Sequence, residues 1–431
     1  MKICMFTNTY LPHVGGVARS VAAFADDLRS RGHAVMVVAP TFPDMENAGE
    51  DEEEVVRVPA IQNFNGSDFS VRILLPCRFS HQLDRFAPDL IHSHHPFLLG
   101  DAALRTARHR GLPIVFTHHT LYERYTHYVP FDSAPLRHFV IDLATRFANL
   151  CRIVISPSES IAELLEERGV KVPCRVVPTG VDVDFFGSGR GDRFRSRHDI
   201  PADAFVIGHL GRLAPEKNLS FLADAVCQTL SSLEKGVFLV AGKGPSTADI
   251  RQIFADAGIS EQLVLAGEVQ GDELRDCYAA MDLFAFASTS ETQGMVLTEA
   301  MAAGLPVIAL DAPGAREVVV DGSNGRLLPQ DALGKKFAQA IREACDEETL
   351  AAWRKQALQT AKEFSRQASA GKLEEVYREA LTAERHSAVP ELDAWDGLLE
   401  TLRAEWELAA SKFSAAIEAV GHWSDNPKGP Q

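Results

Sequence analysis

The fold is decided by the stretch KICMFTNTYLPHVGGVARSVAAFADDLRSRGHAVMVVAP at residues 2–40. It contains an apolar strand at 2–6, a glycine pair, an amphipathic helix expected over 18–31, and a second apolar strand at 34–40. Parallel strands joined by crossover helices are buried on both faces, so they are almost continuously apolar and do not alternate with polar residues. The stretch therefore predicts an α/β protein with a parallel sheet.

The same alternation continues along the chain in two series. The first adds DLIHSH, PIVFTHH, CRIVISPS and CRVVPTGVD, and the second contains FVIGHLGR, VFLVAGKG, QLVLAGEV, LFAFAS and PVIAL. Two doubly wound units with a hinge at 179–184 explain this order. Such sheets bind ligands at the carboxyl ends of their strands, so chemistry is expected there.

Length and charge narrow the class of protein. The 431 residues suit two domains, and a net charge of −16 argues against nucleic-acid binding. The charge is divided unevenly, at about −3 for residues 1–190 and about −13 for 191–431. A near-neutral first half, in which nine of the fifteen His lie within 60–160, remains compatible with a membrane surface.

The cysteines and the hydrophobic runs indicate the compartment. Seven scattered Cys form no C-x-x-C pair, which argues against a disulfide framework and structural zinc. The apolar run at 2–6 is too short for a signal peptide, and no run of about 18 apolar residues could span a bilayer. We expect a reduced, cytoplasmic protein that is at most peripheral to the inner face of the cell membrane.

The C-terminal segment 386–431 carries a separate pattern. Apolar residues at steps of three and four predict a helix of about 30 residues; they are Leu392, Trp395, Leu399, Leu402, Trp406, Ala409, Phe413, Ile417 and Val420. The helix could pack on its own domain or form a homodimer. Its acidic polar face argues against a membrane-surface helix.

A glycine pair ends the first strand region. Gly15 and Gly16 precede the helix at 18–31, where backbone N–H groups and the helix dipole can hold an anion, although such a pair is also common in ordinary turns. The pair is not G-x-G-x-x-G, and no suitable acidic residue follows about 20 positions later. A dinucleotide-dependent oxidoreductase is therefore disfavoured.

The second unit contains two stretches with more chemistry, GRLAPEKN at 211–218 and ETQGMVLTEAMAAGLPVIA at 291–309. Arg212 and Lys217 follow a strand and suit a diphosphate; alternatively, either could form a salt bridge with a residue such as Glu216.

The second stretch places polar groups around the start of a helix. The residues at the start of this helix, Gly294, Met295 and Val296, offer backbone N–H groups to a phosphate. Glu299 can reach a ribose diol, and Glu291 can accept hydrogen bonds from sugar hydroxyls. Glu299 could equally be an ordinary acidic residue near a helix N-terminus.

In combination, these motifs resemble family 4 of the retaining glycosyltransferases, which have the GT-B fold. The resemblance covers about residues 1–385 and includes the glycine pair and the hinge phrase VPTGVD. It implies two Rossmann-like doubly wound domains facing across a cleft: 1–180 for the acceptor and 181–365 for a nucleotide sugar. A helix at 366–385 would cross back to the first domain, and 386–431 would be a helical extension.

The resemblance also implies roles for the residues. Arg212 and Lys217 would bind the donor diphosphate, Glu299 the ribose and Glu291 the donor sugar. Gly294, Met295 and Val296 would contact sugar and phosphate through their backbone, with Gly15 and Gly16 approaching from the other domain. No metal is expected, because the D-x-D at 182–184 lies in the hinge and the Arg/Lys pair supplies positive charge.

The stretch VFTHHTLYERYTHYVPF at 115–131 indicates the acceptor side. His119 matches a family histidine and would orient substrate and stabilise charge, whereas His118 is interpreted as a buried core residue. Within this stretch, the pattern H-T-x-Y-E-x-Y-x-H-Y at 119–128 resembles a motif of bacterial diacylglycerol glucosyltransferases. This resemblance makes Tyr122, Tyr125 and His127 acceptor candidates. The helix expected at 136–152, with Arg137 and Arg146, could dock on a membrane or simply cover the sheet.

The sequence therefore predicts a retaining glycosyltransferase that moves glucose from UDP-glucose to 1,2-diacylglycerol. Alternatives within the family are another glycolipid, a polyprenyl-linked sugar or a small soluble acceptor. A nucleotide-sugar epimerase or a binding protein without transfer remains as a different class.

Overall fold

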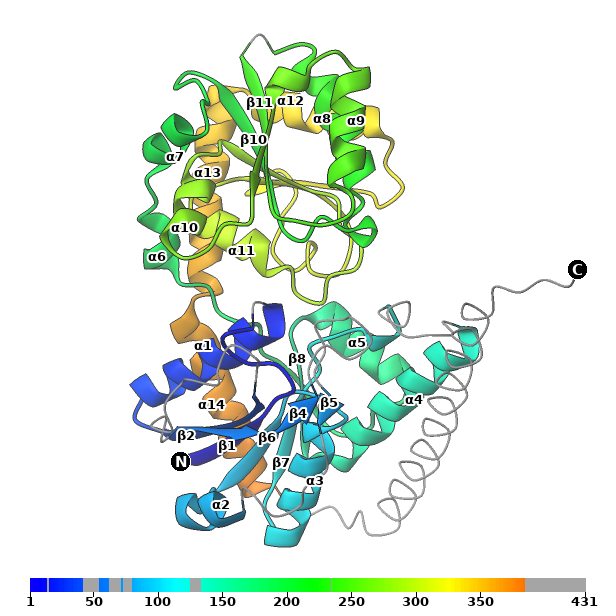
Figure 1. Ribbon diagram of the computed structural model, residues 1–431, viewed down its shortest axis with the longest axis vertical. Coiled ribbons are helices and arrows are strands. Elements are labelled where there is room, and N and C mark those ends of the chain that lie inside the picture. The colour runs from blue at the N-terminus through cyan, green and yellow to red at the C-terminus, as the bar shows by residue number, and fades with distance from the viewer. Residues whose placement is uncertain are drawn as a thin grey trace, which may run out of the picture.

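Two lobes, each built on a parallel sheet, lie one above the other in Figure 1, and the predicted α/β class with two doubly wound sheets is confirmed. The computed structural model describes residues 1–13, 15–41, 54–61, 71–72, 80–124, 133–233 and 235–383. The predicted extension 386–431 lies outside the described residues.

The first sheet has, among the described residues, seven parallel strands in the order β3-β2-β1-β6-β7-β8-β9. Their bounds are β1 Lys2–Phe6, β2 Ala34–Pro40, β3 Val55–Val58, β6 Leu90–Ser93, β7 Ile114–Thr117, β8 Ile153–Ser156 and β9 Cys174–Val176. Two short strands that follow β3 along the chain form a separate antiparallel pair; they are β4 Ala60–Ile61 and β5 Val71–Arg72. The edge strand β3 was not predicted, because it is four residues long, includes Arg57 and is only partly buried.

Helices cover both faces of this sheet. One face packs α1 (Gly16–Ser30) and α14 (Arg366–Thr382) against Ile3, Met5 and Val37. The other face packs α3 (Leu99–Arg110), α4 (Ala134–Leu150) and α5 (Glu159–Glu167) against alternate residues of the same strands. The remaining helical segments of this half are α2 Ser80–Phe86 and the 3-10 turn η3 Tyr122–Arg124. Alternation within each strand thus supplies two separate cores.

The second sheet is also parallel, with the order β12-β11-β10-β13-β14-β15 among the described residues. Its strands are β10 Phe205–Leu210, β11 Gly236–Ala241, β12 Leu263–Gly267, β13 Leu283–Phe286, β14 Val307–Leu310 and β15 Gly325–Leu328. The first five strands were predicted. The edge strand β15 was not, because GRLL is short and begins with a turn-forming glycine.

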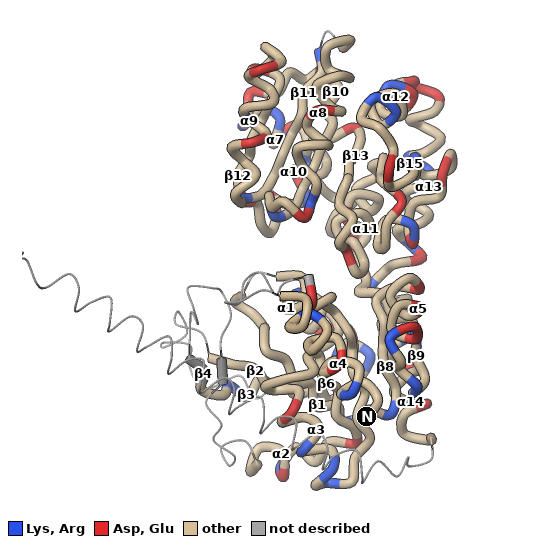
Figure 2. Tube along the Cα trace, turned by 90° about the vertical axis from the view of Figure 1, so that its right-hand side faces the viewer, with Lys and Arg blue, Asp and Glu red and all other residues tan. Residues whose placement is uncertain are grey.

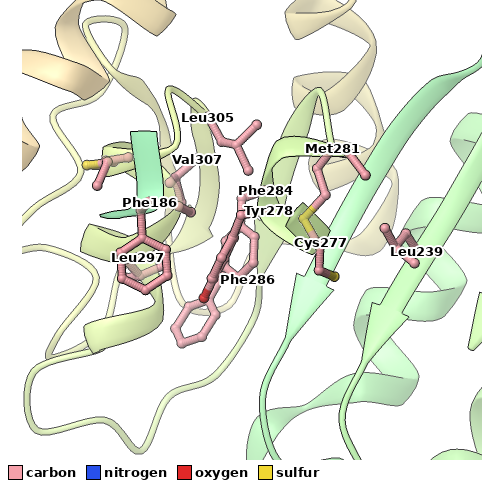
Figure 3. Close-up of a cluster of buried hydrophobic side chains, with 14 of the residues drawn as sticks. Phe186, Leu239, Cys277, Tyr278, Met281, Phe284, Phe286, Leu297, Leu305 and Val307 are labelled. Atoms are coloured by element: carbon pink, nitrogen blue, oxygen red, sulfur yellow. The ribbon is translucent and has the colours of Figure 1, made fainter. Parts of the chain in front are cut away.

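The second sheet is likewise covered on both faces. Its helices are α6 Val183–Gly187, α7 Gly191–Arg197, α8 Leu219–Leu230, α9 Thr247–Asp256, α10 Asp272–Ala279, α11 Met295–Ala302, α12 Gly334–Ala344 and α13 Glu347–Glu363, with 3-10 turns η5 Pro215–Lys217 and η6 Ser260–Gln262. Figure 3 shows Tyr278 from α10 beside Phe284 and Phe286 of β13 and Leu297 of α11. This aromatic cluster fixes α11 against the sheet. Figure 2 shows that Lys, Arg, Asp and Glu lie mainly on the helices and loops of both lobes.

The chain crosses between the lobes twice, and the two crossings touch. Val181 N–H donates to the Phe364 carbonyl at 2.8 Å, and Arg366 N–H donates to the Val181 carbonyl at 3.0 Å. A Cβ on Gly180 would lie 2.5 Å from the Arg366 Cα, so only glycine fits there. Asp182 of the D-x-D sequence caps α6 by accepting from Phe185 N–H at 2.9 Å. After the second crossing, α14 packs on the first sheet (Figure 1).

Candidate active site

The carboxylate of Glu299 lies where the two lobes meet. Glu299 is in the second turn of α11, and its side chain is only 4% exposed. Oε2 accepts from the Tyr278 hydroxyl at 2.9 Å, and Oε1 accepts from the Arg19 guanidinium of the first lobe at 2.6 Å. A buried carboxylate needs such partners to remain charged. Glu299 is therefore a fixed acceptor at the junction.

Glu291 and Lys217 form a second ion pair in the loops that follow β13 and β10. The Lys217 ammonium and the Ser288 hydroxyl, at 2.7 Å, both donate to Oε1 of Glu291. Burial alone would raise the pKa of Glu291, but Lys217 and Ser288 outweigh it and hold that pKa below its ordinary value. Glu291 is thus an anion that can accept further hydrogen bonds.

Arg212 lies at the same sheet end and is more exposed. It lies two residues after the end of β10, its side chain is 44% exposed, and it pairs with Glu216 four residues later. This is the salt bridge that the sequence left open as an alternative. A solvent-exposed pair of this kind contributes less than about 1 kcal/mol, so a more highly charged ligand can displace it. The structure therefore places Arg212 and Lys217 together without assigning either to a ligand.

The start of α11 provides backbone donors beside these side chains. Gly294 precedes the helix with φ of 70°, a left-handed conformation that favours glycine. Met295 and Val296 are the first two helical residues, where N–H groups have no intrahelical acceptor. The predicted grouping of Gly294, Met295 and Val296 with Glu299 on one helix start is present.

The first lobe contributes the start of α1. Gly15 is the N-cap and Gly16 the first helical residue, and no side chain of the described residues caps this end. A Cβ on Gly16 would meet nothing within 4 Å among the described residues, so packing does not require glycine there. An open helix start without a cap suits an anion that comes close to the backbone.

Five histidines gather at the carboxyl ends of β6 and β7; they are His92, His94, His95, His118 and His119. Burial lowers the pKa of His92, His95, His118 and His119 to about 3, so these rings are neutral near pH 7. His118 is 2% exposed, and neither of its ring nitrogens has a hydrogen-bond partner among the described residues. His119 keeps partial exposure and binds His94 through its ring, with Nδ1 of His94 and Nε2 of His119 2.9 Å apart.

Several hydrogen bonds join the first lobe to the second, and one of them is made by His119. The Thr292 hydroxyl donates to the His119 carbonyl at 2.9 Å, and the Ser158 hydroxyl donates to the Thr292 carbonyl at 2.7 Å. Gln293 exchanges two hydrogen bonds with the Thr179 backbone, at 2.8 and 2.7 Å. The residues between Glu291 and Gly294 thus bridge to the strand ends of the first lobe.

Of the three acceptor candidates, Tyr122, Tyr125 and His127, the described residues include Tyr122 alone. Tyr122 lies in η3 against Phe97 and His118, and its buried hydroxyl has no partner among the described residues. Tyr125 and His127 lie outside the described residues. On α4, Leu143 and Phe147 pack into the core, whereas Arg137 and Arg146 are exposed, and Arg146 pairs with Asp142 at 2.7 Å.

Sequence reasoning missed Arg19 and Tyr278. Arg19 is one turn into α1, and Tyr278 is in α10, before β13. Neither is close in sequence to Glu299, and no spacing rule links them to it. One feature of the sequence could have pointed to Arg19. It places a positive charge in the first turn of a helix, where a negatively charged side chain is usually favoured.

Two features are absent from the described part of the chain. No helix there is both long and apolar enough to cross a membrane. No group of three or more His, Cys, Asp or Glu residues in that part could hold a metal ion.

Comparison with known families gives two matches that follow one another in the chain. Residues 14–185 match Glycosyltransferase Family 4, and residues 204–347 match Glycosyl transferases group 1.

Curated relatives extend over most of the chain. An alpha-monoglucosyldiacylglycerol synthase from Streptococcus pneumoniae is 33% identical over 337 residues, which cover 76% of this chain and 75% of the relative. A protein of the same name from Acholeplasma laidlawii is 28% identical, covering 75% of this chain and 84% of the relative. A GDP-mannose-dependent alpha-mannosyltransferase from Mycobacterium tuberculosis is 30% identical, with 79% and 87% covered.

Solved structures share the fold at lower identity. Anabaena Alr3699/HepE in complex with UDP superposes with a TM-score of 0.69 at 20% identity, covering 88% of this chain and 100% of the other. The sucrose-phosphate synthase of Thermosynechococcus elongatus gives 0.70 at 19% identity, with 89% and 99% covered. These matches extend across both lobes, so the architecture as a whole is shared.

Proposed function

The chain belongs to glycosyltransferase family 4 and has the GT-B fold, and from this premise we propose that it transfers glucose from UDP-glucose to 1,2-diacylglycerol with retention of configuration. The observation that carries the proposal is the pair of carboxylates at either side of the start of α11, the buried Glu299 and the partly buried Glu291. One carboxylate faces a lysine and the other an arginine from the opposite lobe. A nucleotide sugar needs acceptors for its hydroxyls and cations for its diphosphate, and this junction contains both.

On the donor side, the ribose would hydrogen-bond to Glu299, whose oxygens still have lone pairs beyond the contacts of Arg19 and Tyr278. Lys217 and Arg212 would turn to the diphosphate, where charge grows as the sugar leaves. The N–H groups of Met295 and Val296, and of Gly15 and Gly16 from the other lobe, would bind the same phosphates.

Glu291 would then hold the sugar. When Lys217 moves to the phosphate, Glu291 keeps the Ser288 hydroxyl and gains sugar hydroxyls as donors. The Ser288 and sugar hydroxyls, which donate to this carboxylate, favour its charged form in place of Lys217. In a same-face reaction the leaving phosphate takes part in deprotonating the acceptor, so the protein needs to hold and orient rather than supply a strong base.

His119 fits this orienting role. Burial lowers its pKa to about 3, so the ring is neutral and can donate or accept one hydrogen bond without carrying charge. It would bind an oxygen of the donor sugar or of the phosphate beside the acceptor hydroxyl.

The acceptor proposal rests on the first lobe and on the names of relatives. Tyr122 offers a buried hydroxyl close to His118, and η3 lies beside α4 in the packing. The exposed side of α4 carries Arg137, His138 and Arg146 with one acid, Asp142. A basic helix next to the acceptor residues would allow peripheral docking on an anionic cytoplasmic membrane surface.

A donor and acceptor screen tests the proposal. Purified protein is incubated with UDP-glucose, UDP-galactose or GDP-mannose and vesicles that contain diacylglycerol, with a soluble sugar acceptor in parallel. We expect glucosyl-diacylglycerol from UDP-glucose alone, with the α-anomeric configuration retained in the product.

GDP-mannose is included because a mannosyltransferase is 30% identical to this chain, and product from GDP-mannose would overturn the donor assignment. Product on the soluble acceptor alone would overturn the lipid assignment, and epimerised nucleotide sugar or binding without turnover would overturn transfer itself.

A further inference from the structure

Two neutral histidines share one hydrogen bond at the ends of β6 and β7. His94 follows β6, is completely buried, and is held by its own backbone N–H, which donates to the Phe6 carbonyl at 2.9 Å. His119 follows β7 with its Nε2 2.9 Å from the His94 Nδ1, and the two rings are stacked at an angle of 24°. Because neither ring carries charge near neutral pH, one nitrogen must donate and the other must accept.

Burial decides which ring donates. Within the described part of the chain, the second nitrogen of His94, Nε2, is buried and has no hydrogen-bond partner. If His94 accepted at Nδ1, its proton would be on Nε2, which would leave a buried donor unsatisfied. If His94 donates from Nδ1, Nε2 is only an unused acceptor. Unsatisfied buried donors are the rarer of the two in folded proteins, so the second arrangement is favoured.

The His94 ring is also held in place. His92 lies against it with ring centroids 4.0 Å apart. Both nitrogens of His92 are engaged, by the Tyr377 hydroxyl at 2.7 Å and the Thr117 hydroxyl at 2.7 Å. Tyr377 comes from α14, the helix that returns from the second lobe. The His94 ring is thus packed against a histidine that has no freedom to rotate.

We propose that His94 is a positioning residue that donates to Nε2 of His119 and so places the His119 proton on Nδ1. His119 then presents an N–H group to the oxygens of the donor sugar or phosphate, and it cannot take a proton from the acceptor through that nitrogen. The inference deepens the proposed function, because it depends on His119 touching the substrates. It turns a histidine that could have been a base into a hydrogen-bond donor of fixed direction.

The tautomer can be measured without any activity. Full-length protein with ¹⁵N-labelled histidine rings is studied by long-range ¹H–¹⁵N correlation NMR, and the His119 signals are identified by their loss in His119→Gln. We expect a protonated Nδ1 and an unprotonated Nε2 on His119. In His94→Asp, whose carboxylate can only accept, we expect the proton to move to Nε2. A wild-type His119 protonated on Nε2 overturns the proposal.

Kinetics with UDP-glucose and diacylglycerol vesicles then test whether the tautomer matters. His94→Leu removes the donor, and we expect kcat to fall by about 10-fold or more with little change in the donor KM. His94→Asn places an amide N–H near the position of Nδ1, and we expect it to restore kcat to within about 3-fold of wild type. Unchanged kcat in folded His94→Leu overturns the positioning role. If wild type transfers no sugar at all, the proposed function fails, while the NMR result still stands or falls alone.

Discussion

The Arg19 guanidinium in the first lobe donates to Oε1 of Glu299 in the second lobe at 2.6 Å, across 280 residues of sequence. The charge of Glu299 raises the pKa of Arg19, which is already high, so the guanidinium stays protonated at any ordinary pH. The carboxylate proposed to bind the ribose is therefore also a contact that holds the two lobes together. Removing Arg19 should loosen the lobes without disturbing either core.

We expect Arg19→Ala to increase the radius of gyration of the nucleotide-free protein in small-angle X-ray scattering, and we expect added UDP to reduce the difference. The Arg19 side chain is 42% exposed, so the free energy of unfolding should change by less than about 1 kcal/mol. Arg146→Ala is the matched control, because it breaks an exposed ion pair within one helix. Identical scattering curves for Arg19→Ala and wild type would contradict this role.

Glu291→Gln separates sugar transfer from nucleotide binding. The amide keeps the size of the side chain but loses the charge that balances Lys217 and that we propose holds the sugar hydroxyls. We expect kcat to fall about 100-fold or more, while the affinity for UDP measured by calorimetry stays within about 3-fold. Lys217→Met should do the reverse and weaken UDP binding. Glu268→Gln, which removes an exposed partner of Lys243, serves as the control, and equal losses of UDP affinity in both site variants would argue against this division of roles.

The buried histidines make stability sensitive to mild acid. His92, His95, His118 and His119 have pKa values lowered from 6.5 to about 3 by burial, so the unfolded chain binds protons first as the pH falls. The contribution of these rings to stability is fully present above pH 6.5 and is lost progressively as the pH falls from 6.5 toward 3. Glu291, whose pKa is also lowered, adds a further loss only below its ordinary value of 4.5. Chemical denaturation at pH 7.5, 6.5 and 5.5 should show this loss, and a flat profile would contradict it.

Replacing one of these rings should reduce the slope. His118 has neither nitrogen partnered among the described residues and packs edge-on against Phe116 and Tyr122. His118→Leu removes a buried polar group that makes no bond, so we expect unchanged or higher stability at pH 7.5 and a smaller loss at pH 5.5. The comparison variant is His92→Leu, which should be destabilised at both pH values because it leaves Tyr377 and Thr117 without their partner.

Much of the fold could be predicted because buried parallel strands are apolar throughout. The strands at 2–6 and 34–40 were evident from composition alone. The edge strands β3 and β15 were not predicted, because each is four residues long and includes Arg57 or begins with Gly325. The edge strands β9 and β12 were predicted although they are only partly buried, because each lies in a longer apolar run.

The candidate site, like the fold, could be predicted only in part. Glu291, Gly294 and Glu299 could be grouped because they share one loop and helix start. The pairing of Lys217 with Glu291 depends on two strand ends that are adjacent only in the folded sheet. His118 and His119 could be told apart from the sequence, because of the resemblance to a family histidine at His119, and adjacent residues at a strand end face opposite sides of the sheet.

The last prediction concerns the exposed side of α4. Anionic vesicles attract basic residues by about 1 kcal/mol each near the surface, and Asp142 offsets part of this by pairing with Arg146 at 2.7 Å. We therefore expect the double variant Arg137→Glu, Arg146→Glu to lose sedimentation with phosphatidylglycerol vesicles, and Asp142→Asn to increase it. The double variant and Asp142→Asn both change residues on the exposed side of the helix, away from Leu143 and Phe147, so thermal melting should stay close to wild type.

Because salt screens the attraction between the helix and the vesicles, the gain of sedimentation in Asp142→Asn should disappear in about 1 M salt. If wild type does not sediment with the vesicles, or if the two variants shift it in the same direction, α4 is only a cover for the sheet.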